Sequence, residues 1–166
     1  MFLAMAETPP LLIAWHSRTG ASEAMARAAA AAAGDVARLI AASEVQPADI
    51  LAAQAYLFVC PENLVTMSGI MKDMFDRCYY PVLGQIEGRP YGTAIAAGSD
   101  GEGAQRQIDR IATGWRLRRV AEPLIVNLQA QTPEAILAPK IVPRHELDRC
   151  GELAAALVAG LELGIY

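Results

Sequence analysis

Hydrophobic and polar residues alternate along this chain in blocks that predict strands followed by helices. Short, continuously apolar runs are typical of strands that are covered on both faces of a sheet. Five such runs predict strands over 11–15, 36–40, 56–60, 91–97 and 120–127. The third run reads YLFVC and contains no charged residue. We therefore expect a sheet of five strands with both faces buried.

Between these runs, apolar residues recur at three- and four-residue spacing, which predicts helices. An alanine-rich helix is expected over 20–33, with Gly34 as its stop, and a short one over 47–53 with Pro47 in its first turn. Further helices are expected from an N-cap at Ser68 to near Pro81, from Glu102 onward, as a capped turn over 132–134, and along the stripe from Leu147 to Leu161. Strands that alternate with helices predict a parallel sheet in a three-layer α/β fold.

The length of 166 residues suits one domain, and no linker, repeat or low-complexity segment divides the chain. We expect a single domain over 1–166, with 1–10 as a short N-terminal extension and Met5 as an alternative start. The extension lacks the basic and apolar regions of a secretory signal, and no apolar run approaches the roughly 20 residues of a membrane span. A cytoplasmic protein without membrane contact is therefore expected.

Charge and cysteine content exclude several classes of partner. The net charge of −4 argues against a nucleic-acid-binding protein. The three cysteines lie far apart and form no CxxC pair, so we expect reduced, buried thiols. Two histidines are too few for a histidine-based metal centre, and no metal site is expected.

Three loops follow the first, third and fourth predicted strands, and open parallel sheets bind ligands at this carboxyl edge. The first loop, SRTGAS over 17–22, leads from a strand into a helix, where unpaired N–H groups and the helix dipole favour an anion. Ser17, Thr19 and Ser22 supply neutral donors for a terminal phosphate. No GxGxxG or GxxxxGK[ST] motif is present. On this loop alone, the alternative that the hydroxyls merely cap the helix stays open.

The other two loops offer groups that suit a planar heterocycle. The second, PENLVTMSG over 61–69, presents backbone amides, the Asn63 amide and the Thr66 hydroxyl. The third, over 98–103, has three glycines, which allow the backbone to approach a ligand closely. Taken singly, each loop is more commonly a simple connection. Because all three should meet at one edge of the sheet, together they predict a ligand site.

Three stretches resemble the flavodoxin-like superfamily, and most nearly its NAD(P)H-dependent FMN reductases and quinone reductases. They read SRTGAS before an alanine-rich helix, CPENLVTMSGIMKDMFDR, and AAGSDGEGAQRQI. The first matches the family pattern S-x-T-G-x-[ST] at Ser17, Thr19, Gly20 and Ser22, and the second carries the family's K-x-[FM]-[FL]-D-R run. The resemblance extends from Leu11 to the final helix. It implies a five-stranded sheet of order 2-1-3-4-5 with FMN at its carboxyl edge.

The resemblance also implies three groups of FMN-binding residues. The phosphate would be wrapped by the first loop and the preceding histidine, at His16, Ser17, Arg18, Thr19, Gly20, Ala21 and Ser22. The ribityl chain and isoalloxazine would be lined by Pro61, Glu62, Asn63, Leu64, Val65 and Thr66. The ring would be approached from its other side by Ser99, Asp100 and Gly101.

One departure from the family concerns the flank of the flavin ring. Many relatives carry an aromatic residue just after the proline of the second loop, whereas this chain has Glu62, Asn63 and Leu64. Stacking on that side is then weak, or a partner subunit completes it in a homodimer. Other aromatic residues that could flank the ring, each of which otherwise serves in packing, are Tyr79, Tyr80 and Tyr91.

The leading hypothesis is an FMN-dependent oxidoreductase in which NAD(P)H delivers hydride to the flavin and a quinone, free flavin or other small acceptor receives the electrons. The cofactor supplies the redox chemistry, so we assign no general base. Titratable residues near the predicted site are His16, Glu62 and Asp100, which equally well serve as loop polar groups.

Two other functions remain open. The first is a flavodoxin-type electron carrier that docks a protein partner, although a net charge of −4 is weak for electrostatic steering. The second is a flavin-free binding protein of the same fold. A cluster of arginines forms solvated surface or meets a nucleotide phosphate, and comprises Arg106, Arg110, Arg116, Arg118 and Arg119.

Overall fold

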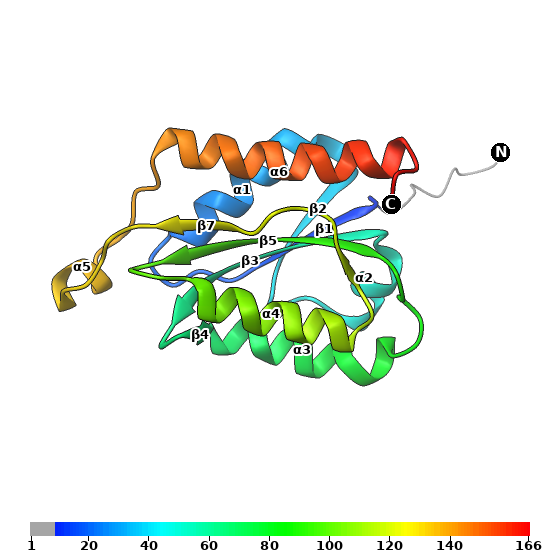
Figure 1. The fold of residues 1–166 in the computed structure, drawn as a ribbon, viewed down its shortest axis with the longest axis horizontal. Coiled ribbons are helices and arrows are strands. Elements are labelled where there is room, and N and C mark those ends of the chain that lie inside the picture. Colours follow the sequence, from blue (N-terminus) through cyan, green and yellow to red (C-terminus); the bar gives the residue numbers. More distant parts are fainter. Residues whose placement is uncertain (1–8) are drawn as a thin grey trace.

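The structure is a computed structural model that describes residues 9–166. The expected start at Met5 and most of the expected N-terminal extension fall on residues 1–8, outside the described part of the chain. A sheet lies between two layers of helices, with α1 and α6 on one face and α3 and α4 on the other (Figure 1). These four helices span Ala21–Ala33 (α1), Gly69–Val82 (α3), Glu102–Gly114 (α4) and Arg144–Glu162 (α6).

The sheet confirms the predicted order 2-1-3-4-5. Its five main strands are all parallel, in the spatial order β2 (Ala37–Ala41), β1 (Leu11–Trp15), β3 (Ala55–Asn63), β5 (Pro90–Ala97) and β7 (Leu124–Asn127). Two strands of two residues each are added to this frame, β4 (Thr66–Met67), antiparallel to β3, and β6 (Arg118–Arg119), parallel to the start of β5. Short helices complete the fold, α2 (Pro47–Ala52), the 3₁₀ turn η1 (Gly34–Val36) and α5 (Pro133–Leu137).

Three sequence-based expectations differ from the structure in detail. The strand expected over 120–127 begins only at Leu124, because Pro123 has no N–H group to donate to the sheet. The region 61–69, expected to be a loop, contains the hairpin of β3 and β4. Ser68 is the N-cap residue of α3, but its hydroxyl does not cap the helix, since it bonds the ring of His16 instead.

Successive residues of each strand point to opposite faces of the sheet, and the two faces have different cores. The face under α3 and α4 is aromatic, with Phe58 packed edge-on against Phe75 at 4.9 Å between ring centroids. The face under α1 and α6 is built largely from alanines such as Ala26, Ala29 and Ala154. Small side chains let these two helices approach the sheet and each other closely, which explains the alanine excess in the composition.

The three cysteines, Cys60, Cys78 and Cys150, are buried and unpaired, as expected. Burial raises the pKa of the Cys60 thiol to about 12, so it stays protonated at neutral pH. Over residues 9–166, no helix is both long enough and apolar enough to cross a membrane. The same part of the chain contains no cluster of histidine, cysteine and acidic residues able to hold a metal ion.

Candidate functional site

A cleft of about 160 Å³ opens at the carboxyl edge of the sheet, where α1 begins. Seven of the residues predicted for the site line it: Ser17, Arg18, Thr19, Ala21, Ser22, Pro61 and Asn63. The end of β5 and the segment after β7 complete its wall, through Ala96, Ala97, Gly98, Leu128, Ala130, Ile136, Leu137 and Lys140. The remaining predicted residues lie around the cleft without lining it, namely His16, Gly20, Glu62, Leu64, Val65, Thr66, Ser99, Asp100 and Gly101.

The start of α1 leaves hydrogen-bond donors directed at this cleft. Gly20, the N-cap residue, has a φ of 100°, and no side chain caps the helix. N–H groups in the first turn of a helix have no partner within it, and they carry the positive end of the helix dipole. The Ser22 hydroxyl is buried, with 1% of the residue exposed, and has no hydrogen-bond partner among the described residues. An orphaned buried hydroxyl costs about 1–3 kcal/mol, which an external acceptor would recover.

The hydroxyls of the first loop therefore have different roles. Ser17 Oγ accepts a hydrogen bond from the Gly20 N–H at 3.1 Å, which fixes the turn before the helix. Thr19 lines the cleft, and its carbonyl oxygen accepts from the Lys140 N–H at 2.8 Å. Ser22 makes no such internal bond. The alternative that these hydroxyls only serve the start of the helix accounts for Ser17 and leaves Ser22 unexplained.

Residues 128–143, between β7 and α6, supply a wall that the sequence analysis missed. Figure 1 shows α5, within this segment, at the same end of the molecule as the β3–β4 hairpin. Lys140 is half-buried, and its ammonium donates to the carbonyl oxygens of Ile136 at 2.9 Å and Ala138 at 2.6 Å. The pattern that could have found this wall is topological, because the loop after the fifth strand also leaves the carboxyl edge.

The second predicted loop forms a tight hairpin whose turn residues are Leu64 and Val65. Both have positive φ values, 51° and 71°, the conformation of a type I′ turn, which usually takes Asn-Gly. A β-branched residue in this conformation is strained by about 1–2 kcal/mol. Both tip residues are exposed, Leu64 to 96%. The hairpin packs on α4 so closely that a Cβ on Gly103 would collide with Val65.

The third predicted loop is held by the second one. The Glu62 carboxylate accepts hydrogen bonds from the Gly101 N–H at 2.9 Å and the Ala104 N–H at 3.0 Å. It thereby occupies the N-terminus of α4, where a negative group is favourable. The side-chain amide of Asn127 donates to the Ser99 carbonyl. N–H groups at the start of α4 thus have an internal acceptor, whereas the corresponding N–H groups at the start of α1 have no carboxylate partner among the described residues.

His16 connects the first loop with the start of α3. Its Nδ1 lies 2.8 Å from Ser68 Oγ. Burial is the main cause that lowers the pKa of His16, and the charge of Arg18 lowers it further. The imidazole is therefore uncharged at neutral pH, and it fixes the two loops relative to each other.

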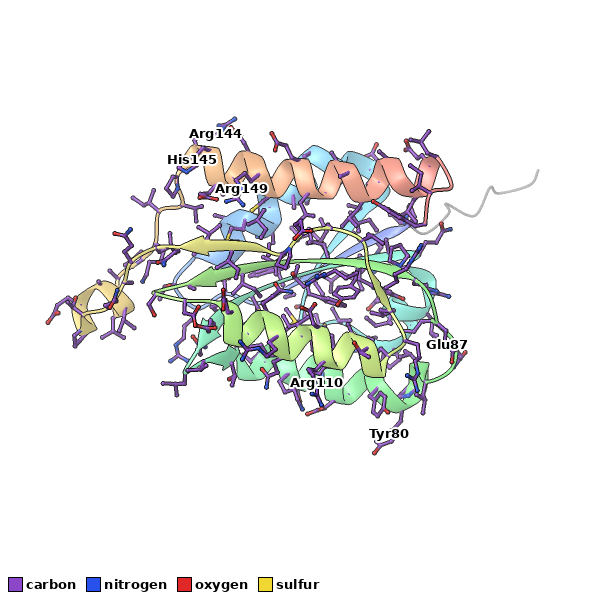
Figure 2. All side chains as sticks on the ribbon, viewed as in Figure 1. Tyr80, Glu87, Arg110, Arg144, His145 and Arg149 are labelled. Atoms are coloured by element: carbon purple, nitrogen blue, oxygen red, sulfur yellow. The ribbon has the colours of Figure 1, made fainter. Side chains whose placement is uncertain are left out.

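The basic cluster and the tyrosines named in the sequence analysis lie outside the cleft. Arg110 points outward from α4, and Tyr80 lies at the opposite end of the molecule from α5 (Figure 2). Arg119 pairs with Asp109 at 3.2 Å, and the Tyr91 hydroxyl donates to the same carboxylate at 2.7 Å. None of Tyr79, Tyr80 and Tyr91 lines the cleft. The flank of a ligand in this cleft is accordingly aliphatic.

No protein-family model and no curated protein sequence matches the chain. Solved structures do match in shape. A flavodoxin from the domain Archaea is 16% identical, with 92% of this chain and 98% of that chain covered and a TM-score of 0.73. The flavodoxin WrbA-like protein from Agrobacterium tumefaciens is 16% identical, with 90% and 94% covered and a TM-score of 0.72. Rubredoxin oxygen:oxidoreductase from Desulfovibrio gigas is 16% identical, with 96% of this chain but 38% of that chain covered and a TM-score of 0.71.

These similarities in shape, at low sequence identity, show the fold alone. The chain has the flavodoxin-like fold that the sequence resemblance implied, over nearly all of its length. The cleft lies where the β1–α1 loop meets the ends of the neighbouring strands, which is the ligand edge of such sheets.

Proposed function

We propose that this chain binds FMN at the cleft and acts as an NAD(P)H-dependent oxidoreductase that passes electrons to a quinone, a free flavin or another small acceptor. The observation that carries the proposal is the buried, unpartnered hydroxyl of Ser22 in the first turn of α1. A helix N-terminus with a further free donor is suited to a phosphate group. The flavodoxin and WrbA-like names of the structural neighbours support a flavin in particular.

The dimensions of the cleft fit part of FMN. Its volume of about 160 Å³ is below the roughly 300 Å³ at which small-molecule pockets begin. We infer that the cleft would take the phosphate and the adjoining polyol, and that the ring would lie at its rim. Aliphatic side chains of that wall, Leu128, Ile136 and Leu137, replace the aromatic flank of many relatives.

Bound FMN would supply the hydride and electron chemistry. The Ser22 hydroxyl and the first N–H groups of α1 would hold its phosphate, and the Ser17–Gly20 bond keeps the turn in shape. The exposed Asn63 amide, on the hairpin, is available to polar atoms of the ring. We assign no general acid or base, because His16 is neutral and engaged with Ser68 and Glu62 is engaged with α4.

An electron carrier that docks a protein is the second candidate, and the hairpin tip favours it. Leu64 is 96% exposed and Val65 66%, so an apolar surface projects beside the cleft. Such a tip offers contact area to a protein acceptor. The same tip suits a second copy of the chain, and we propose a homodimer; a monomeric mass by light scattering of the FMN-loaded protein would overturn the dimer alone.

The test begins with a fluorescence titration of the protein with FMN and riboflavin. Tight FMN binding and at least about tenfold weaker riboflavin binding are expected, since riboflavin leaves the cradle donors unpaired. Absence of FMN binding would contradict the proposal. The FMN-loaded protein is then mixed with NADH or NADPH in a stopped-flow instrument, with a quinone as acceptor. Rapid bleaching of the flavin supports the reductase, and a flavin that stays oxidised for minutes favours the carrier.

A further inference from the structure

The cleft contains a cationic side chain that the phosphate loop itself does not provide. Lys140 lines it together with Ser17, Thr19 and Ser22, although it lies at the other end of the chain. Its side chain is half-buried, and among the ion pairs of residues 9–166 none involves Lys140. The ammonium therefore carries a charge that no carboxylate of residues 9–166 neutralises, and this charge is available to an anion in the cleft.

The backbone of Lys140 is fixed against the loop that begins α1. The Lys140 N–H group donates to the Thr19 carbonyl at 2.8 Å. A Cβ placed on Gly20 would lie 3.9 Å from the carbonyl oxygen of Lys140. The position of the residue therefore depends on the main chain and not on the ammonium. A substitution that keeps this backbone bond changes the charge at the cleft without releasing the segment.

The present partners of the ammonium satisfy its hydrogen bonds only in part. Two of its three donors reach the carbonyl oxygens of Ile136 and Ala138, which carry no formal charge. At a protein surface an ammonium and an anion attract each other more strongly than in bulk water, so the charge of Lys140 would favour an anion in the cleft. Four kinds of donor thus line one cleft: the N-terminus of α1, an orphaned hydroxyl, the guanidinium of Arg18 and the ammonium of Lys140.

We propose that Lys140 makes this cradle selective for a doubly charged phosphate monoester. The inference rests on the proposed FMN site and assigns the larger part of its preference for FMN over riboflavin to Lys140, a charge outside the phosphate loop, beside the more exposed Arg18 of the loop itself. Hydrogen bonds from an ammonium to a phosphate oxygen are roughly twice as strong as neutral ones. Ser22 and the helix N–H groups position the phosphate, and Lys140 compensates its charge.

A purely structural role for Lys140 predicts a different outcome. If the ammonium only fastens the end of α5 through Ile136 and Ala138, its loss loosens one wall of the cleft. Binding of phosphorylated and unphosphorylated flavin would then weaken together, and arginine would restore both. A charge-selecting role affects the phosphorylated ligand alone.

The experiment compares the full-length protein with Lys140→Met, Lys140→Arg and the control Lys72→Met, which removes a lysine that is paired with Asp76 on α3. FMN, riboflavin and inorganic phosphate are titrated, the flavins by fluorescence and the phosphate by calorimetry. Lys140→Met should weaken FMN binding about tenfold and leave riboflavin unchanged, whereas Lys140→Arg and Lys72→Met stay near wild type. Added salt should reduce FMN affinity more in the wild type than in Lys140→Met.

Equal FMN affinity in wild type and Lys140→Met would overturn the proposal, as would equal losses for FMN and riboflavin. If the wild type binds inorganic phosphate but neither flavin, the proposed function fails while Lys140 is still tested through phosphate. Loss of phosphate binding in Lys140→Met then supports the lysine, and unchanged phosphate binding overturns it. A wild type that binds none of the three ligands overturns both proposals.

Discussion

Helices α1 and α4 begin with the same backbone geometry, but the polar groups at their N-termini have different hydrogen-bond partners. Each follows a parallel strand through a left-handed glycine, Gly20 with φ 100° and ψ −16°, and Gly101 with φ 92° and ψ −17°, and neither has a side-chain cap of its own. At α4, the carboxylate of Glu62 accepts from the Gly101 and Ala104 N–H groups. At α1, no carboxylate of residues 9–166 does so, and Ser22 remains unpartnered among them. The N–H groups at the start of α4 therefore have an internal partner, whereas the start of α1 is left open for the ligand that we propose.

The charged residues near the starts of α1 and α4 also differ in sign. The start of α4 is bordered by the acidic residues Glu62 and Asp100. The cleft at the start of α1 is lined by the cations Arg18 and Lys140, and Glu23 in the first turn pairs with Arg27 at 2.9 Å. An anionic ligand is accordingly repelled at one junction and attracted at the other, although the backbone geometry is the same.

The largest change in FMN affinity is expected from a variant that places a carboxylate at the N-terminus of α1, as is already the case at α4. Thr19→Glu places a negative charge beside the proposed phosphate, and two like charges roughly 4 Å apart repel by about 4 kcal/mol near a protein surface. We expect FMN affinity to fall about a hundredfold or more, with no loss of helix, because helix N-termini favour acidic side chains. Titration with FMN and far-UV circular dichroism measure the two effects.

The control for this variant is Ser43→Glu, which adds the same charge at an exposed turn after β2, outside the cleft. It should bind FMN nearly as well as the wild type. A folded Thr19→Glu protein with unchanged FMN affinity would show that the phosphate does not bind at this loop.

Removing the carboxylate from α4 should affect stability instead of binding. Glu62→Ala leaves the Gly101 and Ala104 N–H groups without their partner, and we expect the free energy of unfolding to fall by about 2–3 kcal/mol. Urea unfolding measures it. The comparison fails if this variant is as stable as Glu44→Ala, an exposed glutamate that serves as control.

The N-termini of α1 and α5 should also respond differently to the loss of a hydroxyl. Ser22→Ala removes an unpartnered buried hydroxyl, so the unliganded protein should become more stable by about 1–3 kcal/mol, while FMN affinity falls about tenfold. Thr132→Ala is the matched contrast, because Thr132 Oγ1 accepts from the Ala135 N–H at 3.2 Å and caps α5. It should cost about 1 kcal/mol. A Ser22→Ala protein destabilised as much as Thr132→Ala would mean that Ser22 has an internal partner.

The smallest expected effect is a difference in stability between the alanine variants of Gly20 and Gly101. Gly20→Ala places a side chain in the left-handed region, at a cost of about 1 kcal/mol, and its Cβ meets only the Lys140 carbonyl at 3.9 Å. Gly101→Ala has the same backbone cost, and its Cβ would also lie 2.5 Å from Ile125 Cγ2. We expect it to be less stable than Gly20→Ala by roughly 1 kcal/mol more. Equal melting temperatures of the two variants would contradict this difference.

Most of the fold could be predicted from the sequence, because apolar runs and helical spacing record local burial. The order of the strands came from the resemblance carried by the loop motifs. The hairpin at Leu64 and Val65 was missed, since a turn with two left-handed residues is normally recognised by Asn or Gly. The contacts of Glu62 with α4 and of Lys140 with the first loop join residues that are far apart in the sequence. Patterns within a short window of sequence cannot predict such pairs.

The bond between the Lys140 N–H and the Thr19 carbonyl also has a consequence for biosynthesis. Loop β1–α1 is among the first parts of the described chain to leave the ribosome, and Lys140 is among the last. Contacts between residues so far apart in the sequence form late in folding, because the entropy cost of ordering the intervening chain precedes the stabilisation that the contact provides. The cradle is therefore complete only after the chain through Lys140 has been synthesised, so the proposed binding of a phosphorylated ligand would have to follow the folding of this later segment and not that of the β1–α1 loop alone.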